Sequence, residues 1–255
     1  MASGVEYNTP DPLHATRVYP GHRVLAMFPF FNEEGKLSKL AARITPGLVD
    51  EFLGVNDGSS DNGPAELSAW TIKIINQKHM GVGSCIKTAI RYAREQGFDI
   101  LVVMAGNAKD DPAEIPDLLR PILEGRADYV QGSRYLPGGS SPNLPLFRDL
   151  AIKALSIFFG LYAGQKCTDL TNGFRAYRLT ILDDPRIDIS QSWLDGYEFE
   201  YYVHWKAVEC GYKIVEVPVT KTYPSGDAPY TKIVPILGWW QMLRPFLLLS
   251  LGLRK

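Results

Sequence analysis

The sequence has few cysteines, few histidines and almost no net charge. Its three cysteines lie far apart and form no CxxC pair, so we expect reduced thiols rather than a disulfide framework. The four histidines lack metal-ligand spacing, which argues against a zinc site. A formal net charge of −1 gives no electrostatic reason to expect nucleic acid as a partner. What is left is an ordinary chain of 255 residues, 45% of them hydrophobic, which suits one large globular domain.

Long hydrophobic runs are equally scarce. Residues 1–21 contain no apolar core, so they do not predict a signal peptide, and we expect a flexible segment there. Only residues 146–163 and 235–253 approach the length of a membrane span, and Arg244 and Pro245 interrupt the second. We expect amphipathic helices that lie in a membrane interface. Packing within a core or between two copies of the chain is the alternative, which leaves a homo-oligomer open.

The hydrophobic runs that do occur are short and alternate with helical patterns. This alternation is typical of a Rossmann-like, doubly wound α/β fold, in which a helix joins each parallel strand to the next. We expect five strands, at residues 23–28, 49–57, 71–76, 99–104 and 127–132, with helices at residues 32–44 and 84–95 and from Pro112 onward. The second half is predicted to add a helix at 146–163, a strand at 174–178, a helix from Asp195, a strand at 212–220 and a flexible loop at 222–232.

Every predicted strand in the first half ends in polar residues. Ligands bind at the carboxyl ends of the strands in such folds, and these ends meet at one edge of the sheet. The sequence therefore predicts one shared ligand site rather than several separate turns. The motifs are Asn32-Glu33, Asp57, residues 79–84, Asn107 to Asp111 and Ser133-Arg134.

The order of the motifs resembles a known family. In sequence they read PFFNEE, VNDGSSD, HMGVGS, MAGNAKDDP, GSRYLPGG, DLTNGFRAYR, GYEFE and EVPVT. Together they are similar to family 2 glycosyltransferases with the GT-A fold, and within that family to the polyprenyl-phosphate sugar synthases of the dolichol-phosphate mannose synthase type. The resemblance covers roughly residues 22–232.

The resemblance implies both an organisation and an activity. It implies a GT-A domain at residues 22–220, followed at 221–255 by a mobile loop and an apolar, membrane-associating segment. The implied reaction is inverting transfer of a sugar from a nucleoside diphosphate sugar to a polyprenyl phosphate. The implied location is cytoplasmic, peripheral on the inner face of a membrane. Transfer to a soluble or glycan acceptor, and a non-catalytic nucleotide-sugar-binding protein, are the alternatives.

A nucleotide site is implied at the ends of the first three strands. A carboxylate at position 57 suits base N–H groups and ribose hydroxyls, although aspartate also stabilises turns. Glycines in the following turn would let the backbone approach the nucleotide closely, or they form a plain turn before a helix. The expected nucleotide-binding residues are Pro29, Asn32, Glu33, Asp57, Gly81 and Gly83.

The tip after the fourth strand departs from the family pattern. The family places an Asp-x-Asp metal motif there, and this chain has Ala105, Gly106 and Asn107. One interpretation keeps a Mg²⁺ or Mn²⁺ site, with ligands from Asn107, Asp110 and Asp111. Another interpretation has the Lys109 ammonium stabilise the negative charge on the leaving diphosphate. A purely structural interpretation has Asp111 capping the helix that begins at Pro112.

Phosphate-binding and basic residues are expected in the second half. The resemblance assigns Arg134 to the acceptor phosphate, with Arg148 as a second candidate, and salt bridges are the competing interpretation. Lys232 would close the loop over the donor. Glu198 is the candidate general base if the acceptor is a hydroxyl, with Asp195 as the alternative, whereas a phosphate acceptor needs none.

Overall fold

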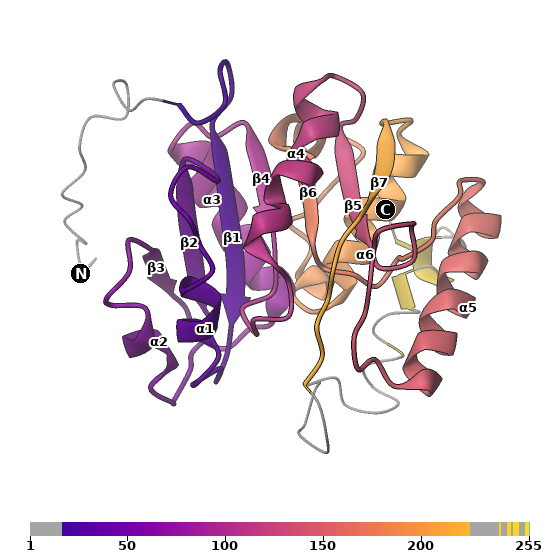
Figure 1. Ribbon diagram of the computed structural model, residues 1–255. Coiled ribbons are helices and arrows are strands. Elements are labelled where there is room, and N and C mark those ends of the chain that lie inside the picture. The colour runs from indigo at the N-terminus through magenta and orange to yellow at the C-terminus, as the bar shows by residue number, and fades with distance from the viewer. Residues whose placement is uncertain (1–16, 225–239, 241–243, 246, 250–252, 255) are drawn as a thin grey trace.

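The computed structural model describes residues 17–224 together with residues 240, 244–245, 247–249 and 253–254. Its centre is a seven-stranded sheet in the order β3-β2-β1-β4-β6-β5-β7 (Figure 1). This arrangement confirms the predicted doubly wound, mostly parallel α/β architecture. The strands are β1 Val24–Phe30, β2 Glu51–Asn56, β3 Lys73–Asn76, β4 Ile100–Val103, β5 Tyr129–Ser133, β6 Arg175–Arg178 and β7 Ile214–Pro218.

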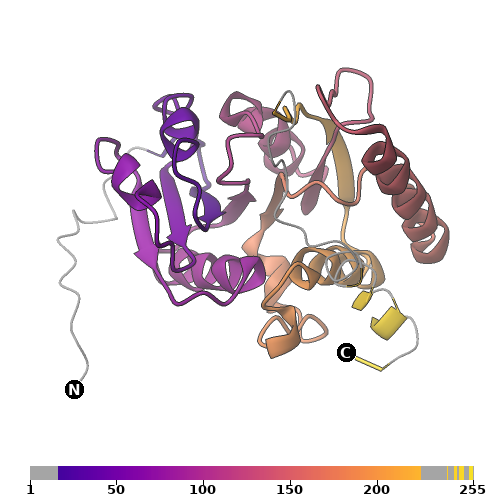
Figure 2. The same ribbon diagram turned by 90° about the horizontal axis from the view of Figure 1, so that it is seen from below.

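Helices cover both faces of this sheet. Figure 2 shows α3 and α6 on one face and α1 and α4 on the other. The pleat of β1 explains both layers, because Leu25 and Met27 enter the core under α3 and α6 while Ala26 and Phe28 enter the core under α1 and α4. The helices are α1 Leu37–Ala41, α2 Gly63–Glu66, α3 Val82–Glu95, α4 Ile115–Leu123, α5 Leu146–Ala163 and α6 Glu198–Glu209.

Strand β6 is the one antiparallel strand among the described elements. It lies between β4 and β5, and Arg175 pairs with Val103 on one side and Gln131 on the other. An antiparallel strand begins at the edge where its parallel neighbours end. The loop before β6 therefore reaches the carboxyl edge of β4 and β5, beside the predicted ligand site.

Two of the predicted helices have wrong boundaries. The helix expected at residues 32–44 shortens to α1, and the helix expected from Asp195 begins at Glu198. The bounds expected for the domain, residues 22–220, stay a prediction, and contacts of the described fold reach past both of them. The Val18 N–H donates to Asp50 at 2.9 Å on one side, and Tyr223 is 2% exposed on the other.

The apolar segments contribute only partly to the described structure. No helix among the described residues has the length and apolarity needed to cross a membrane. Helix α5 stands at the side of the molecule and packs on α6 through Leu155 and Phe159 (Figure 1). The expected loop residue Lys232 and most of residues 235–253 lie outside the described residues.

A buried histidine in α6 leads to a pH prediction. The His204 ring packs between Tyr129 and Phe159, each with ring centroids 5.0 Å away, and its Nδ1 atom is buried without a hydrogen-bond partner among the described residues. Burial, and secondarily the charge of Arg175, lower the pKa of His204 well below 6.5. The folded protein therefore holds a neutral ring where the unfolded chain would take up a proton.

We expect the His204→Phe variant to lose part of the acid sensitivity of the native protein. The pKa of His204 is lower in the folded protein than in the unfolded chain. The contribution of His204 to the free energy of unfolding is therefore complete above the unfolded-state pKa, and it is lost as the pH falls below that value. The native free energy of unfolding should fall by up to about 1.4 kcal/mol for each pH unit below about 6.5, and the variant should lack this component. Urea unfolding of both proteins at several pH values measures it. Parallel pH profiles would contradict the prediction.

Candidate active site

The first part of the site is a turn that Asp57 holds at the end of β2. Asp57 is 4% exposed, and its carboxylate accepts hydrogen bonds from the N–H groups of Met80 and Gly81 at 3.0 and 2.9 Å. Gln77 donates to the same carboxylate at 2.8 Å, and His79 Nδ1 lies 2.9 Å from it. Asp57 thus stabilises the turn, which was the structural alternative, and its contact with a nucleotide stays a prediction.

A ring stack flanks this turn. The rings of Phe31 and His79 are stacked at an interplanar angle of 24°, with centroids 4.1 Å apart. Beside them Asn32 adopts a positive φ of 49° and accepts from the Ser60 N–H at 2.8 Å. Glu33 is 7% exposed and pairs with Lys36. The structure therefore brings Asn32 and Glu33 to the same edge as Asp57, and Pro29 lies just before them in β1.

The two glycines of the turn serve close packing. A Cβ atom at Gly83 would lie 2.0 Å from the Leu194 carbonyl oxygen, and one at Gly81 would lie 2.6 Å from that of Asp195. No side chain fits at such distances. These glycines therefore let the start of α3 meet residues 194–196. The backbone of residues 194–196 is thus the close neighbour of both glycines in the structure. Nucleotide contact at Gly81 and Gly83 remains a prediction.

Residues 104–110 form a rigid tip after β4. Ala105 donates its N–H to Asp110 at 2.8 Å, and Asn107 accepts from the Lys109 N–H at 3.3 Å. The Lys109 carbonyl accepts from the Thr222 N–H at 2.9 Å, so residues 220–222 lie alongside the tip. Gly106 packs against β1, because a Cβ there would lie 2.6 Å from the Pro29 carbonyl oxygen.

The carboxylates of the tip are already engaged. Asp110 is fully buried, and Lys221 Nζ lies 2.5 Å from its Oδ1 atom while the Ala105 N–H binds its Oδ2 atom. Asp111 accepts from the Ala113 N–H at 3.1 Å and caps the following 3-10 turn. That contact confirms the capping interpretation of Asp111.

The donor set of the tip does not fit a divalent ion. Magnesium and manganese need several hard oxygen ligands, usually carboxylates. Ala105 supplies none, Asp110 is neutralised by a lysine and Asp111 faces a backbone N–H. Each of the predicted ligands Asn107, Asp110 and Asp111 thus already has a partner, since the neutral amide oxygen of Asn107 accepts from the Lys109 N–H. The metal site expected from the sequence is therefore not formed by this arrangement.

Cationic side chains gather around Tyr223 instead. The Lys109 ammonium lies 5.1 Å from the centre of the Tyr223 ring, and the Arg148 guanidinium lies 5.8 Å from it. Arg134 donates to the Tyr223 hydroxyl at 2.5 Å. Burial lowers the pKa of Lys109 to about 8, and the nearby charges of Lys221 and Arg148 act in the same direction. Three segments of the chain thus place a cationic side chain beside Tyr223.

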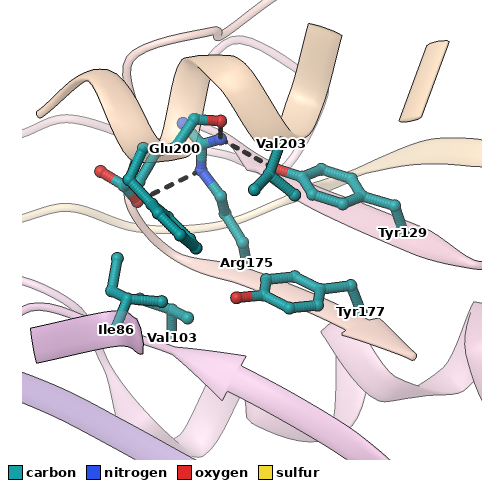
Figure 3. A pocket seen from close by; sticks show the side chains of 8 residues that line it. Ile86, Val103, Tyr129, Arg175, Tyr177, Glu200 and Val203 are labelled. Carbon is teal, nitrogen blue, oxygen red and sulfur yellow. Dashed lines mark hydrogen bonds and ion pairs between the residues drawn. The ribbon is translucent and has the colours of Figure 1, made fainter. Parts of the chain in front are cut away.

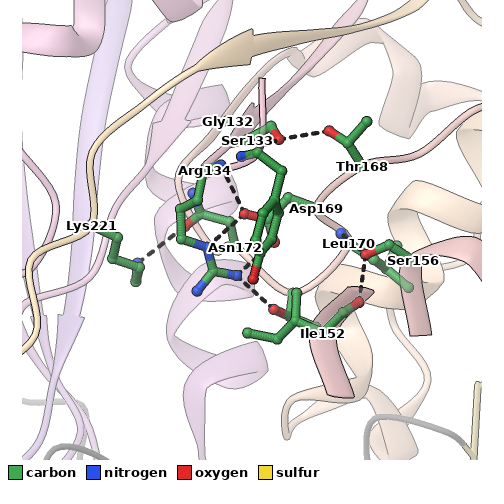
Figure 4. Close-up of polar contacts among 12 residues, drawn as sticks. Gly132, Ser133, Arg134, Ile152, Ser156, Thr168, Asp169, Leu170, Asn172 and Lys221 are labelled. Atoms are coloured by element: carbon green, nitrogen blue, oxygen red, sulfur yellow. Dashed lines mark hydrogen bonds and ion pairs between the residues drawn. The ribbon is translucent and has the colours of Figure 1, made fainter. Parts of the chain in front are cut away.

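Arg134 is buried and forms a two-pronged ion pair with Asp169 (Figure 4). Its Nε and Nη2 atoms each lie 2.6 Å from a carboxylate oxygen, and Nη2 also donates to Thr171 at 2.8 Å. With the Tyr223 contact, four of the five guanidinium N–H donors are committed. The salt-bridge interpretation of Arg134 is confirmed, and its contact with an acceptor phosphate stays a prediction that requires a change of partner.

Each acidic residue in and just before the GYEFE motif has its own cationic partner. Glu198 is 3% exposed and pairs with Arg244 at 3.0 Å, and burial raises the pKa of Glu198. Asp195 pairs with Lys87 at 2.6 Å. Glu200 lies 3.4 Å from Arg175. Each candidate base therefore has a cationic partner, so Glu198 as a general base stays a prediction without support from its contacts.

Arg175 borders a small internal cavity that is not the substrate site. Figure 3 shows Arg175 reaching between Tyr129 and Glu200. The cavity holds about 10 Å³, which is room for about one water molecule and too little for a sugar. Arg175 donates to Tyr129 at 2.7 Å and to three backbone carbonyls at 2.9 Å, those of Leu170, Asn172 and Glu200. It holds the loop before β6 against α6.

Several residues of the site have no assigned role in the sequence prediction. Asp169 and the Thr171-Asn172-Gly173 turn stand out as a motif, but nothing in the sequence pairs them with Arg134 or Lys221. Tyr223 and Lys221 fall in a segment that reads as the edge of a loop. The available signal was that Lys221 and Tyr223 stand at alternate positions just after a predicted strand, which could have indicated that both side chains point to the same side.

Comparisons with known proteins agree with this architecture. A family model described as Glycosyl transferase family 2 matches residues 26–185. Polyprenol monophosphomannose synthase of Mycolicibacterium smegmatis is 30% identical over 213 residues, covering 80% of this chain and 79% of that protein. Undecaprenyl-phosphate mannosyltransferase of Micrococcus luteus is 31% identical over 241 residues, covering 87% of this chain and 98% of that protein.

A solved structure shares the fold. Glucosyl-3-phosphoglycerate synthase of Mycobacterium tuberculosis, in complex with Mn²⁺, uridine diphosphate and phosphoglyceric acid, matches with a TM-score of 0.63 at 17% identity. The match covers 88% of this chain and 78% of that chain. A further structure of that enzyme contains Mg²⁺ and uridine diphosphate. The architecture is thus the GT-A fold, and the family match and the identity to two relatives show that the chain belongs to glycosyl transferase family 2, a family of glycosyltransferases.

Proposed function

We propose that this glycosyltransferase moves a sugar, with inversion at C1, from a nucleoside diphosphate sugar to a polyprenyl phosphate. The gathering of Lys109, Arg134 and Arg148 around Tyr223 carries the proposal. Both substrates bring phosphate groups to the reacting carbon, and guanidinium and ammonium groups suit them. The names of the two relatives support a polyprenyl phosphate acceptor and make mannose the first sugar to test.

The proposed chemistry is a single in-line displacement. An oxygen of the acceptor phosphate forms a bond to C1 of the sugar as the bond from C1 to the donor diphosphate breaks. The bonding electron pair leaves with the nucleoside diphosphate, whose negative charge grows. A phosphate oxygen is already ionised at neutral pH, so no proton has to be removed. The pairing of Glu198 with Arg244 accords with a reaction that uses no general base.

A transfer screen tests this function. Mannose and glucose donors carried on UDP, GDP or dTDP are offered together with a short polyprenyl phosphate. The expected result is a sugar phosphate lipid formed from one of these donors, with inverted configuration at C1 by NMR. Transfer to a soluble sugar or glycerate acceptor but never to the lipid would overturn the proposed acceptor. Nucleotide binding without any turnover would favour a non-catalytic protein.

We also propose that α5 lies on the cytosolic face of a membrane, where a polyprenyl phosphate would be met. The helix exposes a stripe of large apolar side chains, and Arg148 near its first turn lies beside the cationic group around Tyr223. Leu161 is 81% exposed and Phe147 is 77% exposed. The members of the stripe are Leu146, Phe147, Leu150, Ile157, Phe158, Leu161 and Tyr162.

Flotation with lipid vesicles checks this contact. The double variant Ile157→Ser with Leu161→Ser should bind vesicles at least about 10-fold more weakly, because each buried CH₂ group contributes about 0.8 kcal/mol. Trp70→Ser, which changes an exposed aromatic side chain in the loop before β3, is the matched control and should bind as the native protein does. Equal binding by all three proteins would show that α5 does not touch the membrane.

A further inference from the structure

Residues 219–223, which we call the clasp, follow β7 across the candidate site. The main-chain N–H groups of its odd-numbered residues donate to the end of β5 and the loop after it, and those of its even-numbered residues donate to the segment after β4. The clasp therefore joins the strand end that carries Arg134 to the tip that carries Lys109. The five acceptors, in the order of the donors 219 to 223, are Ser133, Glu114, Ser140, Lys109 and Pro142, at 2.9–3.0 Å.

Two side chains of the clasp reach the polar groups of the site. The Lys221 ammonium lies 2.5 Å from Asp110 Oδ1 and 3.1 Å from Asn172 Oδ1. Figure 4 shows Lys221 and Asn172 beside Arg134. Tyr223 accepts a hydrogen bond from Arg134 at 2.5 Å, and its ring is the centre of the cationic group. The position of the clasp backbone therefore sets how these groups are spaced.

Glu114 is the side chain that accepts a main-chain N–H of the clasp. Both of its carboxylate oxygens lie 2.9 Å from the Thr220 nitrogen. The other four N–H groups donate to main-chain carbonyls, which a substitution does not remove. Glu114 is half-buried and ends the 3-10 turn that begins at Pro112, and its own N–H donates to the Asp111 carbonyl at 3.1 Å. A short turn with a proline at its start thus holds the carboxylate in place.

Loss of the Glu114 carboxylate would loosen the clasp at its second residue. The Thr220 N–H would lose both acceptor oxygens, and Lys221 follows Thr220 directly in the chain. Tyr223 depends on the same short stretch of backbone. A misplacement of about 1 Å in groups that orient a substrate can lower a rate by about 100-fold. A small shift of the clasp is therefore enough to affect turnover.

We propose that Glu114 is a positioning residue for sugar transfer, because it holds the clasp in the place where Tyr223 gathers the cationic side chains. This inference rests on the proposed function. Glu114 acts through Thr220 on Lys221 and Tyr223 rather than on the substrate. Attraction between phosphate groups and cations tolerates a small shift, whereas the alignment of the acceptor oxygen with C1 does not. Glu114 should therefore affect kcat more than KM.

Steady-state kinetics with the donor and acceptor that the native protein uses is the first test. Glu114→Ala should lower kcat by about 10-fold or more, with KM for the donor changed by less than about 3-fold. Glu114→Gln keeps an acceptor oxygen and should restore kcat to within about 3-fold of the native value. Asp128→Ala is the matched control, because Asp128 accepts the Lys213 N–H at 3.0 Å at the other end of β7. Its kcat should stay within about 2-fold of the native value.

Hydrogen exchange followed by mass spectrometry is the second test. Amides of residues 219–223 should exchange about 10-fold faster in Glu114→Ala than in the native protein, and Asp128→Ala should leave them unchanged. A native kcat in Glu114→Ala would overturn the inference and leave the transferase function standing. So would an equal loss of kcat in Asp128→Ala, or a Glu114→Gln variant as slow as Glu114→Ala. No product from the native protein with any donor or acceptor would overturn the proposed function and this inference with it.

Discussion

Replacing Arg175 with methionine is expected to lower the free energy of unfolding by about 4 kcal/mol. Arg175 is 2% exposed and donates to the carbonyls of Leu170, Asn172 and Glu200, each at 2.9 Å. Methionine is close to the arginine stem in shape but donates no hydrogen bond. The variant removes a donor from each of these carbonyls, although the Asn172 carbonyl keeps Gln131 as a donor at 2.7 Å. Each buried acceptor that is left without a donor costs about 1–3 kcal/mol.

Urea unfolding followed by circular dichroism measures this effect. Arg120→Met is the matched control, because Arg120 pairs with Asp117 at the surface, where both side chains are about half exposed. It should change the free energy of unfolding by less than about 0.5 kcal/mol. If Arg175→Met were as stable as the control, the loop before β6 would not depend on Arg175. The placement of Asn172 beside Lys221 would then need another cause.

The layered fold could be predicted because its signals are local. Short apolar runs such as residues 99–104 are buried strands, and the helical spacing of Leu118, Leu119 and Ile122 gives α4. The same alternation of strands and helices also predicted which edge of the sheet holds the site, because polar residues follow each predicted strand. Glycine at positions 81 and 83 predicted close approach to a nucleotide, and the close approach that the structure shows is to protein backbone. Its backbone partner, residues 194–196, was not visible from sequence.

The charge pairing of the site could not be predicted because it joins residues far apart in the chain. Asp110 and Lys221 are separated by 111 positions, and Arg134 and Tyr223 by 89. A sequence motif shows that a carboxylate exists but not whether a cation already neutralises it. The antiparallel direction of β6 was missed for the same reason, because a four-residue strand carries no sign of its direction. That strand is what brings Asp169 and Asn172 to the site.

Substitution of Asp169 by asparagine is expected to lower the free energy of unfolding by about 3 kcal/mol. Asparagine keeps the shape of the side chain but turns one acceptor into an amide donor, which would face a donor of Arg134. Both partners are almost fully buried, so water cannot replace the lost contact. The guanidinium would keep neutral partners only, namely Thr171, Tyr223 and the one amide oxygen at position 169.

A double-mutant cycle isolates this pair from other effects of the substitutions. Arg134→Met, Asp169→Asn and the double variant should show a coupling energy of about 2 kcal/mol or more, because removing the second partner no longer leaves a buried charge unpaired. The same cycle on Arg94 and Asp183, an exposed pair at 2.7 Å, should give less than about 1 kcal/mol. Equal coupling in the two cycles would mean that Arg134 does not depend on Asp169. Its guanidinium would then be available to an acceptor phosphate without breaking a buried ion pair.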